Sequence, residues 1–183
     1  MKPSDWDNKL DAMSFAVNYH RWILDIFRPY LKGNVAEVGA GRGSFSQLIL
    51  DSEVSRLTAY EPSPKEFWWL EKGMEEKDNV CCINDYFQSD SHRIINQYDA
   101  VVYVNVLEHI QNDRDELFKV KEALHKHGYA LCFVPACQWL YCDIDHAAGH
   151  YRRYERKQLI ELFYSAGFNV ISARYFDIAG IIP

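Results

Sequence analysis

The strongest chemical pattern in the chain is the run E-V-G-A-G-R-G, from Glu37 to Gly43. Apolar residues precede the run and a helical pattern follows it, so its glycines occupy a turn between a strand and a helix. Gly39 and Gly41 let a ligand approach the main chain. Dinucleotide-binding turns have the spacing G-x-G-x-x-G and favour a phosphate. The different spacing and the carboxylate of Glu37 instead predict a cationic ligand, with an amino group and a sulfonium. The alternative is a tight turn without a ligand.

Two further carboxylates follow the next two predicted strands. Glu61 comes directly after the apolar run 57–60, where an acidic side chain can accept both hydroxyls of a ribose. Asp85 comes after 80–83 and can accept the exocyclic amine of an adenine, with Tyr86 or Phe87 against the ring. The alternatives are a solvated surface glutamate and a turn aspartate.

The segment 143–154 combines acidic, imidazole and guanidinium groups. His146 and His150 are four residues apart, which on a helix could bring both imidazoles to one metal ion. Gly149 weakens a helix there and no third ligand is obvious. We therefore expect no metal.

Two other interpretations of this segment stay open. In one, His150 or His146 takes a proton from a hydroxyl or amine nucleophile, while Arg152 and Arg153 steer an anionic group of the substrate. In the other, the segment is a lid-like loop whose arginines pair with acidic neighbours. His109 is a further candidate base, although a helix-start histidine satisfied by the backbone is favoured.

Alternating apolar runs and helical patterns must position these groups. Strands are predicted at 35–38, 57–60, 80–83, 100–104, 129–134 and 168–176, and helices at 12–31, 44–50, 113–127 and 155–166. A capping box with proline starts another helix at Ser63. This alternation predicts the α/β class, with a doubly wound, mostly parallel sheet and helices on both faces. Ligands of such sheets bind outside the carboxyl ends of the strands, where the glycine turn and the two carboxylates lie.

Length and composition exclude several classes of protein. The 183 residues fit one domain, and the net charge of −6 argues against a nucleic-acid partner. No apolar run approaches the roughly 18–20 residues of a membrane-spanning helix, and the N-terminus is too polar for a signal peptide. Five cysteines without a C-x-x-C pair favour reduced thiols. We expect a cytoplasmic protein without a membrane partner.

The sequence resembles class I S-adenosylmethionine-dependent methyltransferases, and most closely the small-molecule type 11/12 methyltransferase domains. The resemblance rests on V-A-E-V-G-A-G-R-G, A-Y-E-P, I-N-D and Y-D-A-V-V-Y-V-N-V-L-E-H-I, and runs from about Tyr19 to about Phe176. The first and fourth motifs are specific together. The resemblance implies a Rossmann-like fold, S-adenosylmethionine as cofactor, S-adenosylhomocysteine as product and a small-molecule acceptor.

The resemblance also implies which residues bind the cofactor. The glycine turn would lie under its methionine part, Glu61 would bind the ribose, Asp85 would face the adenine, and Asn105 would line the sulfonium end. The full set is Glu37, Gly39, Ala40, Gly41, Gly43, Glu61, Pro62, Asp85, Tyr86, Asn105, Val106 and Leu107. Tyr19, on the leading helix with Trp22, is a candidate for covering the site or contacting the substrate.

The C-terminal end departs from the family. Similar domains follow the sixth strand with an antiparallel seventh, and no such strand precedes Pro183. We expect a single domain over 1–183, with a helical cap at 1–34 and a core at 35–183 that is truncated at its C-terminus. The unpaired edge predicts either a homodimer or a weakly stable tail. The missing strand also supports an inactive cofactor-binding module or regulatory partner as the alternative function. The glycine spacing argues against a nicotinamide-dependent oxidoreductase.

Overall fold

The computed structural model describes residues 17–87 and 94–176 of the chain. Two compact units emerge from its internal contacts. The first takes in residues 1–104 and 122–133, and the second residues 105–121 and 134–183, each as far as it is described. The expectation that both belong to a single domain stays a prediction.

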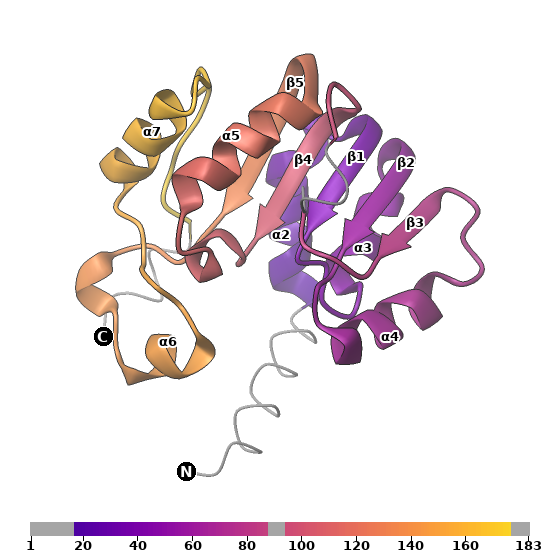
Figure 1. Cartoon of the computed structure of the whole chain (residues 1–183), viewed down its shortest axis with the longest axis horizontal. Coiled ribbons are helices and arrows are strands. Elements are labelled where there is room, and N and C mark those ends of the chain that lie inside the picture. The colour runs from indigo at the N-terminus through magenta and orange to yellow at the C-terminus, as the bar shows by residue number, and fades with distance from the viewer. Residues whose placement is uncertain (1–16, 88–93, 177–183) are drawn as a thin grey trace. The chain divides into compact units, whose positions relative to one another are not determined.

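The first unit is built on a five-stranded parallel sheet in the order β3-β2-β1-β4-β5 (Figure 1). Its strands are β1 (Lys32–Val38), β2 (Glu53–Tyr60), β3 (Val80–Ile83), β4 (Tyr98–Val104) and β5 (Leu124–Phe133). β1 has parallel neighbours on both sides, which explains why its last four residues are buried. The chain runs from β1 outward to β3 and then returns to β4 beside β1. This reversal is the switch point of a doubly wound sheet and confirms the predicted fold class.

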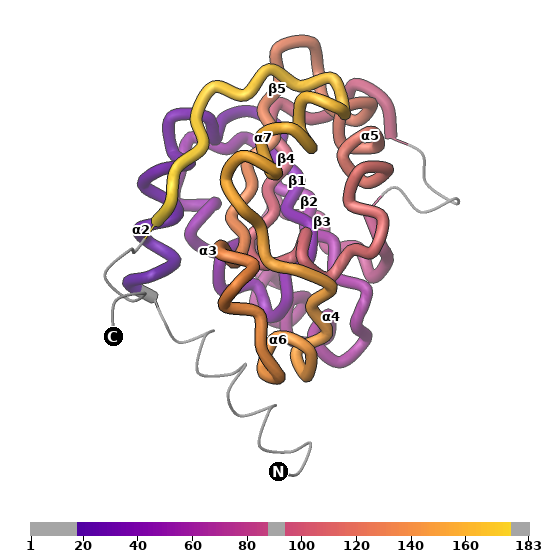
Figure 2. Tube along the Cα trace, turned by 90° about the vertical axis from the view of Figure 1, so that its left-hand side faces the viewer, coloured from indigo at the N-terminus to yellow at the C-terminus, as the bar shows by residue number. Residues whose placement is uncertain are grey.

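Three helices of this unit, α2 (Val17–Phe27), α3 (Ser44–Leu50) and α4 (Pro64–Met74), pack on one face of the sheet. Figure 2 shows α2 and α3 on the same side of the strands. Ile23, Phe45 and Ile49 form one core cluster with strand residues, and Leu70 and Met74 of α4 pack on Ala59. The helix start predicted at Ser63 is confirmed, since the Glu66 N–H donates to its hydroxyl at 3.5 Å. A 3-10 turn, η1 (Arg28–Tyr30), follows α2.

The second unit consists of helices and connecting segments. Its elements are η2 (Leu107–His109), most of α5 (Asp113–Ala123), η3 (Gln138–Leu140), α6 (Asp143–Ala148) and α7 (Arg156–Ser165). The sequence did not predict α6, because Gly149 was taken to weaken a helix. Gly149 instead ends the helix as its C-cap, with φ of 83°. No helix within the described ranges is long and apolar enough to cross a membrane.

One predicted strand and the ends of two predicted helices were wrong. Residues 168–176 form no strand; the Ala173 carbonyl accepts from Arg156 Nε of α7 at 2.5 Å, so a side chain takes up a backbone group that a strand would pair. The helix predicted at 113–127 ends at Ala123, and β5 begins at the next residue. The helix predicted at 12–31 ends at Phe27, and its residues 12–16 lie outside the described part.

Candidate functional site

A cavity of about 140 Å³ lies in the first unit, at the carboxyl end of β1. The glycine turn forms its floor, with Glu37 and Val104 from the strands and His20 and Phe45 from the helices around it. The strands are parallel, so their carboxyl ends meet at one edge of the sheet. The structure thus brings the predicted turn and Glu37 into one cavity.

The glycine turn presents its backbone to this cavity. Gly39 and Ala40 donate their N–H groups to the Tyr60 carbonyl at 2.8 and 2.9 Å. Gly41 has φ of 56°, and a Cβ placed on it would meet no atom within 4 Å. Its main chain therefore faces open space, as an approaching ligand requires.

Gly43 also has a packing role, and its contact with the cofactor stays a prediction. Its φ is 84°, and a Cβ there would lie 2.9 Å from Leu70 Cδ1 and from Met74 Cε. We expect Gly43→Ala to lower the free energy of unfolding by about 2–4 kcal/mol, from backbone strain plus overpacking. Gly41→Ala is the matched control and should cost only about 1 kcal/mol, because its space is empty. Urea unfolding measures both, and equal losses would contradict the packing role.

Glu37 is buried beside the turn and is 3% exposed. Its carboxylate accepts a 2.5 Å hydrogen bond from the Ser46 hydroxyl. Burial, and to a lesser degree the charge of Glu61, raise the pKa of Glu37 to about 8 against the opposing effect of Ser46. The group is therefore mostly protonated at neutral pH, and a cation in the cavity would restore its charge. Ser46 was not predicted as a site residue, because a serine near the start of a helix does not indicate a partner for Glu37.

Glu61 joins three strand ends through its hydrogen bonds. Its Oε2 accepts the Gly41 N–H and its Oε1 accepts the Ser63 N–H, both at 2.8 Å. Asn84, after β3, donates its side-chain amide to the Glu61 carbonyl at 2.8 Å. Burial raises the pKa of Glu61, while the two backbone donors lower it. Each carboxylate oxygen keeps a second lone pair, so the predicted ribose contact is compatible with these bonds. Pro62 links Glu61 to the cap of α4.

Beyond β3, Asp85 accepts the Tyr86 N–H at 2.7 Å, as a turn aspartate does. Tyr86 is 72% exposed, whereas Phe87 is buried with its ring 5.3 Å from that of Tyr60. Tyr86 is thus the ring open to a ligand and Phe87 belongs to the core. The adenine contact of Asp85 and Tyr86 stays a prediction.

On α2, His20 lines the cavity, whereas the sequence pointed to its neighbour Tyr19. The Tyr19 ring packs edge-on against Phe133, with centroids 5.5 Å apart. His20 lies 5.6 Å from Phe45, and burial lowers its pKa, which favours the neutral ring. Trp22 is 59% exposed, so it is not a core residue. The contact of Tyr19 with a substrate stays a prediction.

This fold and glycine turn agree with a family match. A family model described as a methyltransferase domain matches residues 17–173. The chain belongs to the methyltransferase domain family. The match confirms the recognition of a class I methyltransferase from the four motifs. A comparison with curated proteins finds no match.

Solved structures similar to this methyltransferase domain share its fold at low identity. A 1,6-didemethyltoxoflavin-N1-methyltransferase of Burkholderia thailandensis is 21% identical, with a TM-score of 0.74 over 92% of this chain and 75% of that one. An S-adenosylmethionine-dependent methyltransferase of Mesorhizobium loti is 12% identical, with 0.72 over 84% and 82%. A methyltransferase of Leishmania major is 14% identical, with 0.70 over 85% of this chain. The chain spans 65% of the length of the Leishmania protein.

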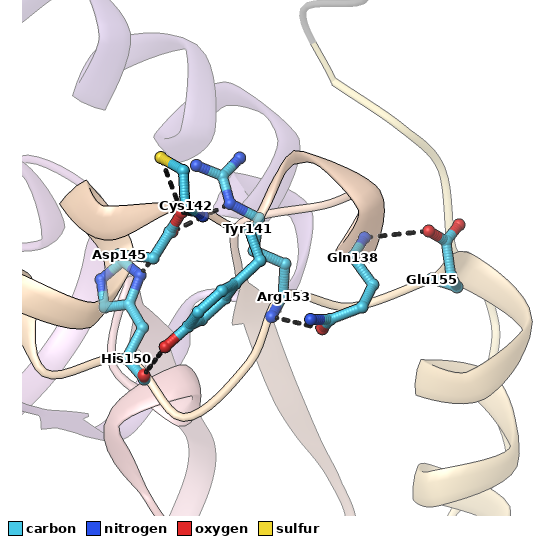
Figure 3. A network of polar contacts seen from close by, with 7 residues as sticks. All are labelled: Gln138, Tyr141, Cys142, Asp145, His150, Arg153 and Glu155. Atoms are coloured by element: carbon cyan, nitrogen blue, oxygen red, sulfur yellow. Dashed lines mark hydrogen bonds and ion pairs between the residues drawn. The ribbon is translucent and has the colours of Figure 1, made fainter.

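The second unit of the methyltransferase domain holds a polar network centred on Asp145 (Figure 3). Asp145 is 2% exposed and accepts from His150 Nδ1 at 2.9 Å, Arg153 Nε at 2.9 Å and the Cys142 N–H at 3.0 Å. Burial would raise the pKa of Asp145, but these donors hold it at about 2. An ionised Asp145 can only accept, so the neutral form of the His150 ring carries its proton on Nδ1 and its lone pair on Nε2.

Beside this network, the methyltransferase brings together Glu108, His109 and His150. The two imidazole rings lie 4.6 Å apart, edge to face. Burial, and less strongly the charge of Asp145, raise the pKa of Glu108 to about 8. Burial and the nearby His150 lower the pKa of His109. His146, which the sequence paired with His150, is exposed on α6 and does not join this group.

Both predicted substrate arginines are engaged within the second unit. Arg152 donates from Nη1 to Asp113 at 2.5 Å and from Nη2 to the Gln111 carbonyl at 2.7 Å. Arg153 donates to Asp145. Pairing with acidic neighbours, one of the two interpretations, is thus present in the structure. Contact with a substrate stays a prediction for both. So does the place of Asn105, Val106 and Leu107 at the sulfonium end.

Proposed function

We propose that the chain transfers a methyl group from S-adenosylmethionine to a small-molecule acceptor. The observation that carries this proposal is the buried carboxyl group of Glu37 in the cavity of the glycine turn. A cation in the cavity would ionise this carboxyl group and be attracted by it, whereas a phosphate would gain no such partner. S-adenosylmethionine carries both an ammonium and a sulfonium, which separates it from the nicotinamide dinucleotides.

The residues around the cavity fit this cofactor. Glu37 would face its amino group, Gly41 offers open backbone for its methionine part, and Glu61 would accept the ribose hydroxyls through its second lone pairs. The bound cofactor supplies a methyl group that is already activated. The chain then has to align the acceptor and exclude water, and a dedicated base is optional.

Similarity to a solved structure supports a small molecule as the methyl acceptor. The Burkholderia structure named above holds 1,6-didemethyltoxoflavin together with S-adenosylhomocysteine, which supports a small molecule as acceptor. Three histidines, His109, His146 and His150, stay candidates for catalysis. The Nε2 lone pair of His150 is the best placed of them, since Asp145 orients the ring. A cytoplasmic location and a homodimer through the C-terminal edge remain proposals, and residues 177–183 lie outside the described part.

A donor-consumption assay over a panel of small-molecule acceptors tests the function. Consumption of S-adenosylmethionine that depends on one acceptor supports it. Calorimetric binding of S-adenosylhomocysteine without turnover on any acceptor would favour the inactive binding module. Binding of NAD in place of S-adenosylhomocysteine would overturn the cofactor assignment.

Glu61→Gln is expected to weaken S-adenosylhomocysteine binding about 10- to 150-fold, because hydrogen bonds to a charged group contribute about 1.5–3 kcal/mol. Isothermal titration calorimetry measures this loss. Glu75→Gln is the control, since Glu75 lies at the exposed end of α4 and pairs only with Lys72 among the described residues. Equal affinities for the two variants would remove Glu61 from the site.

A further inference from the structure

Glu108 is a fully buried carboxyl group that lacks a counterpart. It is 0% exposed, and neither of its side-chain oxygens has a hydrogen-bond partner in the described part of the chain. Other buried acids differ, since Glu37 accepts from Ser46 and Asp145 from three donors. Leaving a buried carboxyl group unsatisfied is costly. Such a group in a folded protein indicates that something absent from the protein chain pairs with it.

Two imidazoles face this carboxyl group. Three possible metal-ligand atoms lie within 4.8 Å of one another, one each from Glu108, His109 and His150. Backbone contacts hold the two segments together, since the Tyr151 N–H donates to the Glu108 carbonyl at 2.8 Å. The Tyr154 hydroxyl also donates to the Leu107 carbonyl at 3.2 Å. All these residues belong to the second unit, so the cluster is a property of that unit alone.

The imidazole of His150 has the neighbour that metal-binding histidines have. A ligating histidine usually donates its other ring N–H to a carboxylate or a backbone carbonyl, which orients its lone pair. His150 donates from Nδ1 to Asp145 at 2.9 Å, which leaves Nε2 free (Figure 3). The backbone of Gly149 lies beside the His109 ring, since a Cβ placed on Gly149 would be 3.7 Å from His109 Nδ1.

We propose that Glu108, His109 and His150 bind a divalent transition-metal ion of the zinc class. Two imidazoles and one carboxylate are a donor set that zinc uses with a further position left open, whereas magnesium and calcium prefer oxygen ligands. Ligand atoms around tetrahedral zinc lie about 3.3 Å apart, so small side-chain rotations would close the present spacing. His109 is exposed, which gives the ion a path from solvent.

This proposal departs from the expectation of no metal that followed when His146 and His150 were considered as a pair. It does not rest on the proposed function, because metal binding is measured without cofactor or acceptor. In this proposal the lone pair of His150 binds a metal ion. It would then not act as the base that accepts a proton from the acceptor.

Titration of the chelator-stripped full chain, free of any purification tag, with Co²⁺ and then Zn²⁺ tests the proposal. We expect one Co²⁺ per chain, with a visible spectrum of imidazole and carboxylate ligands that Zn²⁺ abolishes. The five free cysteines are the competing ligands, and thiolate binding would show as an intense near-ultraviolet charge-transfer band. Such a band on the bound ion would overturn the assignment.

Three variants locate the site. Loss of an orienting neighbour typically weakens metal binding 10- to 100-fold, so we expect loss of a ligand in Glu108→Gln or His109→Ala to weaken it by at least about 100-fold. His146→Ala is the matched control and should keep the full affinity. Glu108→Gln keeps the shape of the side chain, and its melting temperature in chelator reports whether it folds. A folded Glu108→Gln that binds Co²⁺ as the unaltered chain does would overturn the proposal.

Discussion

Asp145→Ala is expected to lower the free energy of unfolding by about 3–5 kcal/mol, because it leaves Arg153 and His150 without their buried partner. The side chain is 2% exposed and accepts three hydrogen bonds. Truncation also orphans the Cys142 N–H at the start of α6. Urea unfolding in the presence of chelator measures the loss independently of any metal. Asp143→Ala, an exposed position in the same helical turn, is the control and should change stability little.

The pH dependence of this loss is a second check. The pKa of Asp145 is held at about 2, below its ordinary 3.8. Its ionised form therefore stabilises the fold above about pH 4, and this contribution disappears as pH falls through about 2. The difference between the variant and the unaltered chain should shrink toward the acid end. A difference that stayed constant down to about pH 2 would show that the lost hydrogen bonds do not depend on charge.

Glu37→Gln is expected to stabilise the cofactor-free chain at high pH while it weakens cofactor binding about 100-fold. The pKa of Glu37 is raised from 4.5 to about 8, so the folded state holds this proton more tightly than the unfolded state. Its favourable contribution is complete below about pH 4.5 and is lost as pH rises through about 8. Glutamine cannot ionise and removes this loss, which amounts to about 3–5 kcal/mol for a shift of this size.

Unfolding of the unaltered and variant chains at about pH 5 and about pH 8 measures the first effect. Glu108 contributes a slope of the same sign to both chains, so only the difference between them reports on Glu37. Calorimetry with S-adenosylhomocysteine measures the second effect. Glu53→Gln, at an exposed position on β2, is the control. A Glu37→Gln chain that binds S-adenosylhomocysteine normally would refute the role of Glu37 toward the cofactor.

The sequence predicted β1, β2 and β4 well because each contains four consecutive buried residues. α3 and β3 have the predicted bounds. The strand predicted at 168–176 was wrong because an apolar pattern does not reveal that Arg156 takes the Ala173 carbonyl. α6 was missed because Gly149 can weaken a helix or end one, and only the backbone conformation separates these cases.

The sequence could predict those site residues that are neighbours along the chain and form a single motif. Glu37 and the glycines lie within one turn, so their spacing revealed them. His20 comes from a different helix and gave no signal of its own. Glu108 and His109 meet His150 across a long stretch of chain, and no fixed spacing indicates this. Contacts between distant segments depend on tertiary packing, which the residue pattern does not encode locally.

The hydrogen bonds of Glu61 have a consequence for how substitutions combine. One residue connects the turn after β1, the start of α4 and the end of β3: its carboxylate accepts from Gly41 and Ser63, and its main-chain carbonyl accepts from Asn84. Changes at sites that share one partner are not additive in their free energies. Double variants among these three positions should therefore show interaction energies, although the residues belong to three separate loops. The three loops are therefore coupled in energy, so that a substitution in one loop changes the free-energy cost of substitutions in the others.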